Sequence, residues 1–165
     1  MNNRVERDQT WETDPDLVKE CARRFTPRGF DLDPCASMVS AKAPYYFTEK
    51  EDGLTQSWIA SDVRKNARRT SDARPIPDKL SVWINFPFGA SEIWVARSLH
   101  WLDTYPEAFQ VMVFCCPSRT DRPWYHRLRR RTYMPDIHGR VSYGDTKGSP
   151  NFSTTIAVAW PDFHY

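Results

Sequence analysis

The hydrophobic positions in the first part of the chain predict one helix and one strand. Apolar residues spaced three and four positions apart fall on a single helical face: Leu17, Val18, Cys21, Ala22 and Phe25. Thr13 or Asp14 can cap this helix, and Pro15 suits its first turn. A proline and a glycine end the helix before residues 30–33, which form a short predicted strand.

The apolar pattern then loses its period for almost forty residues. Residues 41–56 are predicted to form an ordered loop. Residues 61–79 are polar, basic and interrupted by two prolines, so they are predicted to form a basic surface loop.

Strands and helices alternate again in the remainder of the chain. Continuous apolar runs over 80–84 and 111–116 predict strands that are buried on both faces, as in a parallel sheet. Between them, Ser91 is predicted to cap a helix whose apolar residues share one face: Trp94, Val95, Leu99 and Leu102. Another helix is predicted over 123–130.

The C-terminal part is predicted to contain strands without helices between them, at 132–134, 140–143 and 154–160. Strands that first alternate with helices and then follow one another predict an α/β fold. We therefore expect a single domain over residues 1–165, with a mostly parallel sheet and an antiparallel C-terminal edge.

Length and composition agree with this fold. The chain has 165 residues, of which 40% are hydrophobic and 14% aromatic, as expected of one globular domain. No apolar run is long enough for a membrane-spanning helix, and residues 1–9 are polar and charged, unlike a signal peptide. We expect a soluble intracellular protein without a membrane partner.

The cysteines do not predict a metal site. Cys21, Cys35, Cys115 and Cys116 form no C-x-x-C pair, and no histidine lies at zinc-finger spacing. Disulfides are not expected without a secretion signal. Cys115 and Cys116 end an apolar run and are expected to pack as small hydrophobic side chains.

The net charge is only +2, so the distribution of the basic residues says more about possible partners than the net charge does. The first basic cluster comprises Arg64, Lys65, Arg68, Arg69 and Arg74. The second comprises Arg119, Arg122, Arg127, Arg129, Arg130 and Arg131. Such clusters suit a polyanion, since phosphate contacts supply most sequence-independent affinity for nucleic acids. A solvated charged surface is the alternative.

Two predicted strand ends carry polar side chains, and ligands of open α/β sheets bind at such ends. Asp33 begins the turn over residues 33–37, and its carboxylate can accept hydrogen bonds from an ammonium group or a ribose hydroxyl. A purely structural Asp-Pro turn is the alternative.

The second strand end continues as Asn85-Phe86-Pro87-Phe88-Gly89. An amide oxygen and a backbone carbonyl can accept the two protons of an exocyclic amine, while an aromatic face stacks on a flipped base. A loop with an aromatic side chain packed into the core is the alternative.

From about residue 10 to residue 160 the chain resembles the phage-type DNA N6-adenine methyltransferases, the short Dam-like group found in phages and prophages. Six motifs in family order carry the resemblance: W-E-T-D-P at 11–15, F-D-L-D-P-C-A-S at 30–37, Y-F-T with E-D-G-L-T-Q-S-W at 46–58, V-W-I-N-F-P-F-G at 82–89, P-S-R-T-D at 117–121 followed by Trp124 and His126, and I-H-G-R-V at 137–141.

The resemblance implies a Rossmann-like class I methyltransferase domain that transfers a methyl group from S-adenosylmethionine to adenine N6 in DNA, without a metal. Asn85 and the carbonyl of Phe86 would accept the amine protons, in a turn shaped by Pro87, and Phe88 would stack on the base. A phage-encoded enzyme of this kind would act in the host cell cytoplasm.

The resemblance also implies the cofactor-binding residues, which would be Thr13, Asp33, Pro34, Cys35, Ala36 and Asp52. The DNA-binding candidates come from the two basic clusters and are Arg64, Lys65, Arg68, Arg69, Arg119 and Arg122. Among the cofactor-binding residues, Thr13 would contact the methionyl carboxylate of the cofactor, and Asp33 would contact its ammonium group. Asp52, or Glu51 in its place, would accept from the ribose or adenine.

The chain departs from the family at Phe86, where the first proline of the catalytic motif is expected, and at Asp14, where a small residue or proline is expected. Phenylalanine keeps the carbonyl but loses the fixed φ of proline. Two alternatives to adenine methylation stay open. They are a catalytically weak or inactive DNA-binding protein with this fold, and methylation of cytosine N4.

Three further assignments stay open on the sequence alone. Arg119 and Asp121 form either part of a DNA contact or an ion pair that braces a loop. Trp124, Tyr125 and His126 either have a functional role or pack in a helix, and packing is expected for Trp124. His138 and Arg140 contact phosphate or form a surface pair.

Overall fold

The computed structural model describes residues 13–136 and 153–163. A six-stranded sheet forms the centre of this part of the chain. Its strands in chain order are β1 Leu32–Asp33, β2 Tyr45–Tyr46, β3 Arg68–Arg69, β4 Leu80–Ile84, β5 Phe109–Pro117 and β6 Thr154–Ala159. They lie in the order β3-β2-β1-β4-β5-β6. The four central strands are parallel, and β3 and β6 are antiparallel edges, which confirms the predicted α/β sheet and its antiparallel C-terminal edge.

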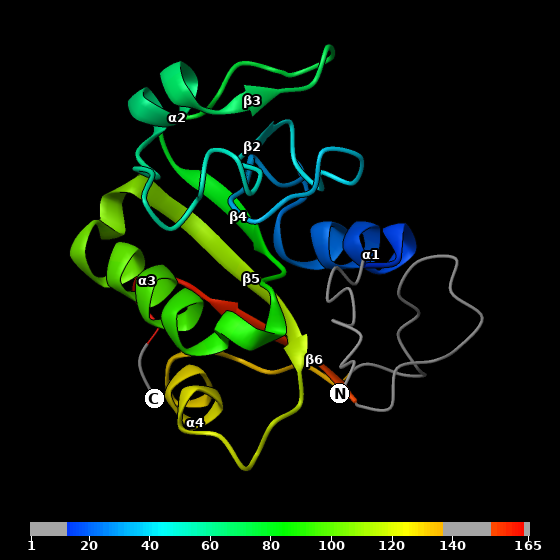
Figure 1. Ribbon diagram of the computed structural model, residues 1–165, viewed down its shortest axis with the longest axis vertical. Helices are drawn as coiled ribbons and strands as arrows, with labels where there is room; N and C mark the ends of the chain where they lie inside the picture. Colours follow the sequence, from blue (N-terminus) through cyan, green and yellow to red (C-terminus); the bar gives the residue numbers. More distant parts are fainter. Residues whose placement is uncertain (1–12, 137–152, 164–165) are drawn as a thin grey trace, which may run out of the picture.

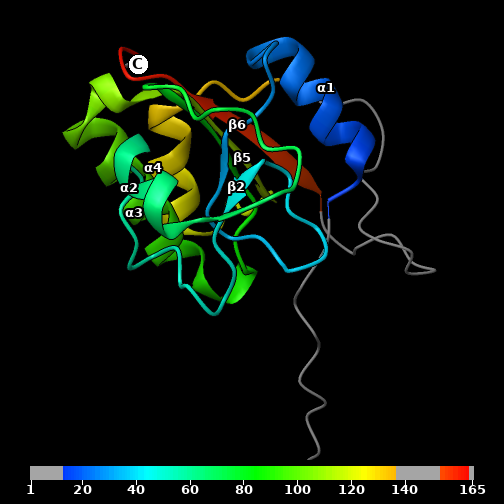
Figure 2. The same ribbon diagram turned by 90° about the horizontal axis from the view of Figure 1, so that it is seen from above.

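Helices cover both faces of this sheet. The α-helices are α1 Pro15–Phe25, α2 Ala60–Asn66, α3 Ser91–Thr104 and α4 Pro123–Arg131, with short 3-10 helices η1 Phe88–Ala90 and η2 Pro106–Ala108. Figure 1 and Figure 2 show α1 on one face, and α3 and α4 on the other. Within the described ranges, every helix is too short or too polar to cross a membrane.

The alternation of side chains along β4 and β5 divides the core into two layers. Val82 and Met112 belong to the larger hydrophobic cluster, which also holds the buried residues of α3 and α4. Trp83 and Val113 belong to the smaller cluster, which packs against α1. Because both faces are covered, all five residues of β4 are buried.

The start of α1 follows the predicted capping pattern, whereas the start of α3 does not. Asp14 Oδ1 accepts a hydrogen bond from the backbone N–H of Asp16 at 2.8 Å, and Pro15 occupies the first turn. The prediction that Ser91 caps α3 is wrong. Ala90 is the N-cap, because η1 leads directly into α3, and Ser91 Oγ donates to the carbonyl of Phe88 at 2.7 Å.

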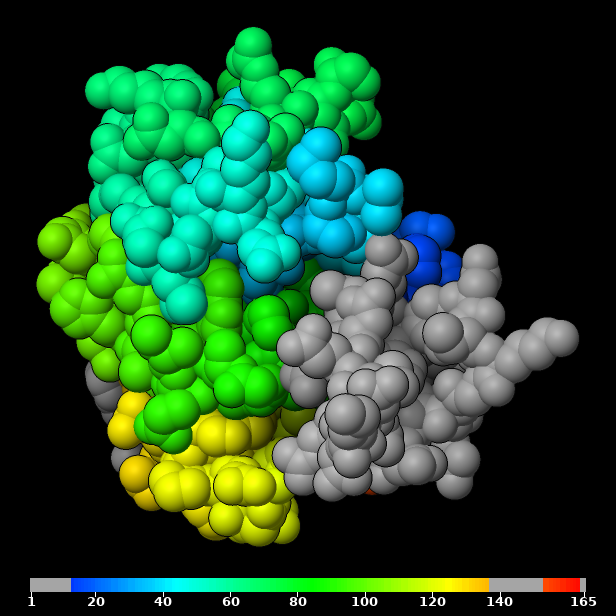
Figure 3. Space-filling view, viewed as in Figure 1, coloured from blue at the N-terminus to red at the C-terminus, as the bar shows by residue number. Residues whose placement is uncertain are grey.

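Two predicted loops contain regular structure. Within 41–56, the structure has β2, which pairs parallel to β1. Within 61–79, it has most of α2 and the edge strand β3, so this basic segment is a loop only in its second half. Ala60 and Val63 of α2 are buried, but two apolar residues among many polar ones give too weak a periodic signal to predict a helix. In Figure 3, the basic segment forms the upper end of the molecule.

The last predicted strands differ in outcome. The strand at 154–160 is confirmed as β6, which pairs with β5. The segment 132–134 forms a single bridge, between Tyr133 and Val158, in place of the predicted strand. The predicted strand at 140–143 lies outside the described residues.

The order of the strands reverses between β1 and β4. From β1 the chain moves to β2 on one side, and it returns to β4 on the other side. In open α/β sheets, the carboxyl ends of the strands at such a switch point form the ligand crevice. Asp33 ends β1 and Asn85 follows β4, so the fold places both predicted site residues at this crevice.

Candidate active site

Asn85 is held by a side chain from the start of α1. Its Nδ2 donates to Thr13 Oγ1 at 2.9 Å, and Thr13 Oγ1 donates to Cys115 Sγ at 3.9 Å. The register of the sheet explains the arrangement. Ile84 of β4 pairs with Phe114 of β5, so the next residues along each strand, Asn85 and Cys115, reach the same level. The site therefore brings together Asn85 after β4, Cys115 near the end of β5, and Thr13, which precedes the N-cap of α1.

Asp33 is buried at the end of β1, with 3% of its surface exposed. Its carboxylate accepts from the backbone N–H groups of Cys35 at 3.3 Å and Lys42 at 3.0 Å. Burial raises the pKa of Asp33 to about 6, and the two backbone hydrogen bonds oppose that rise. A carboxylate has about four acceptor positions, so these two bonds leave acceptor capacity for a cationic group.

The turn after Asp33 contacts the catalytic candidate directly. The backbone N–H of Asn85 hydrogen-bonds the Cys35 thiol, whose pKa is raised well above its usual value by burial. Ala36, in the same turn, donates its backbone N–H to the carbonyl of Phe47 at 3.0 Å. The two predicted strand-end motifs are therefore neighbours in space, which their separation in the sequence does not reveal.

The loop over residues 48–58 packs against this turn and presents Asp52. Gly53 lies so close to Pro34 that a β-carbon there would collide with the Pro34 carbonyl oxygen, which requires glycine. Trp58 is buried, and its Nε1 donates to the carbonyl of Gly53 at 2.9 Å, which ties the loop to the core. Asp52 takes the left-handed backbone conformation at φ 55° and is exposed beside the turn.

Glu51 has a structural role in this loop. One carboxylate oxygen accepts from both the N–H and the hydroxyl of Thr48, and the other accepts from Arg68 Nε at 2.8 Å. These partners, first of all the Thr48 hydroxyl, lower the pKa of Glu51 to about 2. Since Glu51 is engaged in bracing the loop, the geometry favours Asp52 over Glu51 for contact with a ligand.

The residues after Asn85 have three different environments. Phe86 is 1% exposed, and its ring packs edge-on against Trp124 at a centroid distance of 5.8 Å and an interplanar angle of 90°. Pro87 is exposed, and Phe88 is partly buried at the start of η1. The side chain of Phe86 thus belongs to the core, where it contacts α4.

The first basic cluster divides into structural and exposed residues. Arg68 forms the ion pair with Glu51, and Arg74 forms an ion pair with the buried Asp31 at 2.7 Å. Arg64, Lys65 and Arg69 are exposed on α2 and β3. The predicted DNA-binding role of Arg68 therefore competes with its ion pair, while the three exposed side chains are accessible to phosphate.

The second basic cluster is largely occupied by ion pairs. Asp121 accepts from Arg119 at 2.9 and 2.8 Å, and it also pairs with Arg122 at 3.2 Å. Arg119 and Asp121 thus brace the loop, as one of the two sequence-based alternatives proposed. Arg127 pairs with Glu92 at 3.2 Å.

Arg131 has a structural role. It is buried, pairs with Asp103, and donates to three backbone carbonyls: those of Trp160, Pro161 and Phe163. The prediction that it belongs to a surface available to a polyanion is wrong, because α4 turns it toward the C-terminal segment. Trp124 and Tyr125 are buried, which confirms helix packing. His138 and Arg140 lie outside the described residues.

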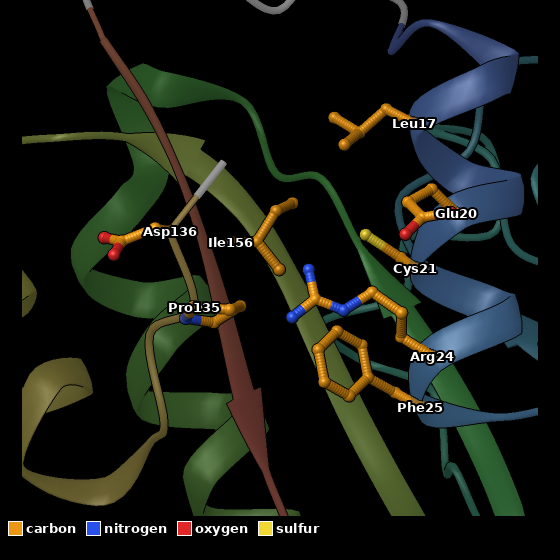
Figure 4. Close-up of a pocket in the computed structure, with 8 residues that line it drawn as sticks. All are labelled: Leu17, Glu20, Cys21, Arg24, Phe25, Pro135, Asp136 and Ile156. Carbon is orange, nitrogen blue, oxygen red and sulfur yellow. The ribbon is translucent and has the colours of Figure 1, made fainter. Parts of the chain in front are cut away.

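A cavity of about 290 Å³ lies away from these strand ends, between α1 and β6. Figure 4 shows its lining residues: Leu17, Glu20, Cys21, Arg24, Phe25, Pro135, Asp136 and Ile156. None of the predicted site residues lines this cavity, so it is not the predicted crevice. The four cysteines are free thiols, and the described residues hold no group of three potential metal ligands.

Two contributors to the site, Lys42 and Cys115, were not predicted from the sequence. Lys42 contributes only its backbone N–H to Asp33, which no side-chain pattern reveals. Cys115 was expected to pack as a hydrophobic residue, and it does so while also accepting from Thr13. Both contributions depend on contacts between distant parts of the chain.

The family model described as DNA N-6-adenine-methyltransferase (Dam) matches residues 2–163, nearly the whole chain. No curated protein matches the chain.

Proposed function

The chain belongs to the Dam family of DNA N-6-adenine-methyltransferases, and from this premise we propose that it transfers a methyl group from S-adenosylmethionine to N6 of adenine in DNA. One observation carries the proposal. The polar residues of two separate family-like motifs, Asp33 and Asn85, flank the switch point of the sheet and are linked through Cys35. The proposed cofactor site and the proposed amine-binding site therefore adjoin each other, as a direct transfer requires.

The residues at the crevice fit the proposed cofactor. Asp33 is a buried carboxylate with room for one more donor, which suits the methionyl ammonium group. Asp52 is exposed beside Pro34, where it can accept from a ribose hydroxyl. Cys35 and Ala36 place small side chains in the turn. S-adenosylmethionine, when bound, supplies the electrophilic methyl group.

The residues after β4 would activate the target amine. Adenine N6 is a poor nucleophile because its lone pair is delocalised into the ring. Asn85 and the carbonyl of Phe86 would accept hydrogen bonds from its two N–H groups, so that the nitrogen becomes more tetrahedral and its lone pair becomes available. Phe88, at the start of η1, would stack on the flipped base, and Pro87 would restrict the turn.

The place of Phe86 in the core supports an active enzyme over an inactive relative. The phenyl ring packs against Trp124 while the carbonyl remains part of the turn, so the substitution has a structural reason. Pro87 also keeps Phe86 out of the helical region. Nothing in the site favours cytosine over adenine.

The pH dependence of cofactor binding tests Asp33. Burial raises the pKa of this carboxyl to about 6, and an ammonium ligand pairs only with its ionised form. The affinity for S-adenosylmethionine should therefore be highest above pH 6, and it should decrease as the pH falls below 6. We expect the Kd for S-adenosylmethionine to rise by about tenfold from pH 7 to pH 5, measured by calorimetry.

Asp33→Asn is the matched control, because it keeps the shape and removes the titration. It should bind about tenfold more weakly than wild type at pH 7 and show little change between pH 7 and pH 5. An equally steep pH dependence in Asp33→Asn would assign the titration to another group and contradict this role.

The salt dependence of DNA binding tests the exposed basic residues. Changing Arg64, Lys65 and Arg69 to glutamine should flatten the log–log slope of affinity against salt by up to about 0.9 for each phosphate contact removed. A control triple, Lys19, Arg24 and Arg28 to glutamine, makes the same charge change at exposed positions outside the basic segment. Equal effects of the two triples would mean that net charge, and not this surface, determines DNA affinity.

The decisive experiment is incubation of the protein with DNA and isotopically labelled S-adenosylmethionine, followed by mass spectrometry of the nucleosides. Labelled N6-methyladenine is the expected product. Label in N4-methylcytosine, or DNA binding without any methylated base, would replace the proposed function by one of the two alternatives.

A further inference from the structure

Thr13 has two hydrogen-bond partners, and one of them is the proposed catalytic amide. The side chain is 1% exposed, and Asp14, the next residue, caps α1. Its Oγ1 accepts from Asn85 Nδ2 at 2.9 Å and donates to Cys115 Sγ. Its position is therefore fixed by the helix start on one side and by the ends of β4 and β5 on the other.

The direction of these hydrogen bonds determines how the Asn85 amide is turned. A threonine hydroxyl has one proton, and here that proton points to Cys115. The oxygen of Thr13 is thus left as an acceptor, and an acceptor selects the Nδ2 corner of the amide. Oδ1 then lies at the opposite corner of the same planar group.

We propose that Thr13 is a positioning residue that orients the Asn85 amide so that Oδ1, and not Nδ2, meets the amine of the target base. This inference rests on the proposed function. With the amide turned around, Nδ2 would present protons to an amine that must itself donate, and the activating hydrogen bond would be lost.

The rival role for Thr13 is contact with the cofactor carboxylate, which the family resemblance implies. That contact needs the hydroxyl group of Thr13 as a donor, and in this structure the hydroxyl donates its hydrogen bond to Cys115. The two roles predict different kinetic changes. An orienting residue affects kcat, whereas a cofactor ligand affects the Kd for S-adenosylmethionine.

Thr13→Val keeps the shape of the side chain and removes the hydroxyl. We expect kcat at saturating cofactor and DNA to fall by about tenfold, as for the loss of one positioned hydrogen bond. The Kd for S-adenosylmethionine should stay within about twofold of wild type, because the cofactor contacts are not changed. Thr13→Ser retains the hydroxyl and should restore kcat to within about twofold of wild type.

A double-mutant cycle with Asn85→Ala distinguishes orientation from general damage. If Thr13 acts through Asn85, Thr13→Val should change kcat by less than about twofold once the amide is absent. Thermal unfolding verifies that each variant is folded, and Thr13→Ala replaces Thr13→Val in the same cycle should the valine variant not fold.

Three outcomes would overturn the inference. They are an unchanged kcat in Thr13→Val, independent effects of the two substitutions, and an increased Kd for the cofactor at unchanged kcat, which would assign Thr13 to the cofactor. Each of these leaves the proposed function intact if the wild type methylates adenine. A wild type that methylates no base would overturn the proposed function itself, and this inference with it.

Discussion

Replacing Asn85 with alanine is expected to lower kcat for adenine methylation by about a hundredfold or more, which is the usual cost of removing a positioned group that stabilises a transition state. Asn85 follows a fully buried strand and is tied to Thr13, so its amide is fixed before substrate arrives. The effect of the substitution should therefore appear in kcat, measured at saturating cofactor and DNA.

The matched measurements for Asn85→Ala are the affinities for cofactor and DNA, which should stay near those of wild type. The predicted cofactor and phosphate contacts lie on other residues, namely Asp33, Asp52 and the exposed basic side chains of α2 and β3. If the wild type and Asn85→Ala are equally inert toward adenine while both bind DNA, the chain is a DNA-binding relative without this activity.

Replacing Phe86 with alanine is expected to reduce the free energy of unfolding by about 3–5 kcal/mol, because a fully buried phenyl ring is lost and a cavity remains. The ring is 1% exposed and packs edge-on against Trp124. Since domains are stable by only about 5–15 kcal/mol, this is a large part of the total. Urea or thermal unfolding measures the change.

Two further variants separate the ring of Phe86 from its backbone. Phe86→Pro restores the family's proline, and it should destabilise the fold by a similar amount because it also empties the pocket. Phe86→Leu keeps most of the volume and the carbonyl, so it should retain activity within about tenfold of wild type. Ile93→Ala, at an exposed position, should change stability by no more than about 0.5 kcal/mol.

Full stability in Phe86→Ala would contradict the structural role of the ring. Full stability combined with faster methylation in Phe86→Pro would instead show that the substitution limits catalysis. The two measurements together therefore distinguish a core residue from a defect in the catalytic turn.

The sequence by itself determined the elements with strong periodic signals. The helices α1 and α3 carry apolar residues at helical spacing, and the central strands β4 and β5 are continuous apolar runs; these elements and α4 were all predicted. These predictions succeed because a helix that is buried on one face, or a strand that is buried on both faces, needs apolar residues at fixed positions in its own sequence.

The sequence also predicted two polar side chains at strand ends. Asp33 ends the short predicted strand at 30–33, and Asn85 follows the apolar run at 80–84, so the order of residues alone predicts that both stand at strand ends. The family resemblance was confirmed by the match over residues 2–163. The roles assigned to individual site residues stay predictions, for which the experiments above are designed.

Only the tertiary structure decided the elements whose stability comes from distant partners. β2 and β3 are two residues long and pair with each other, β2 also pairs with β1, and α2 buries only Ala60 and Val63. Elements this short have too few residues to show a period, so their conformation depends on the neighbours that cover them.

The tertiary structure likewise decided how charges and side chains are used. The sequence presents Arg64, Arg68, Arg74 and Arg131 as equivalent basic residues, yet only the first is exposed, while the others pair with Glu51, Asp31 and Asp103. It also determined that Phe86 fills the core and that Thr13 meets Asn85. Such contacts join residues that are far apart in the sequence, and a hydrogen bond or an ion pair leaves no periodic trace along the chain.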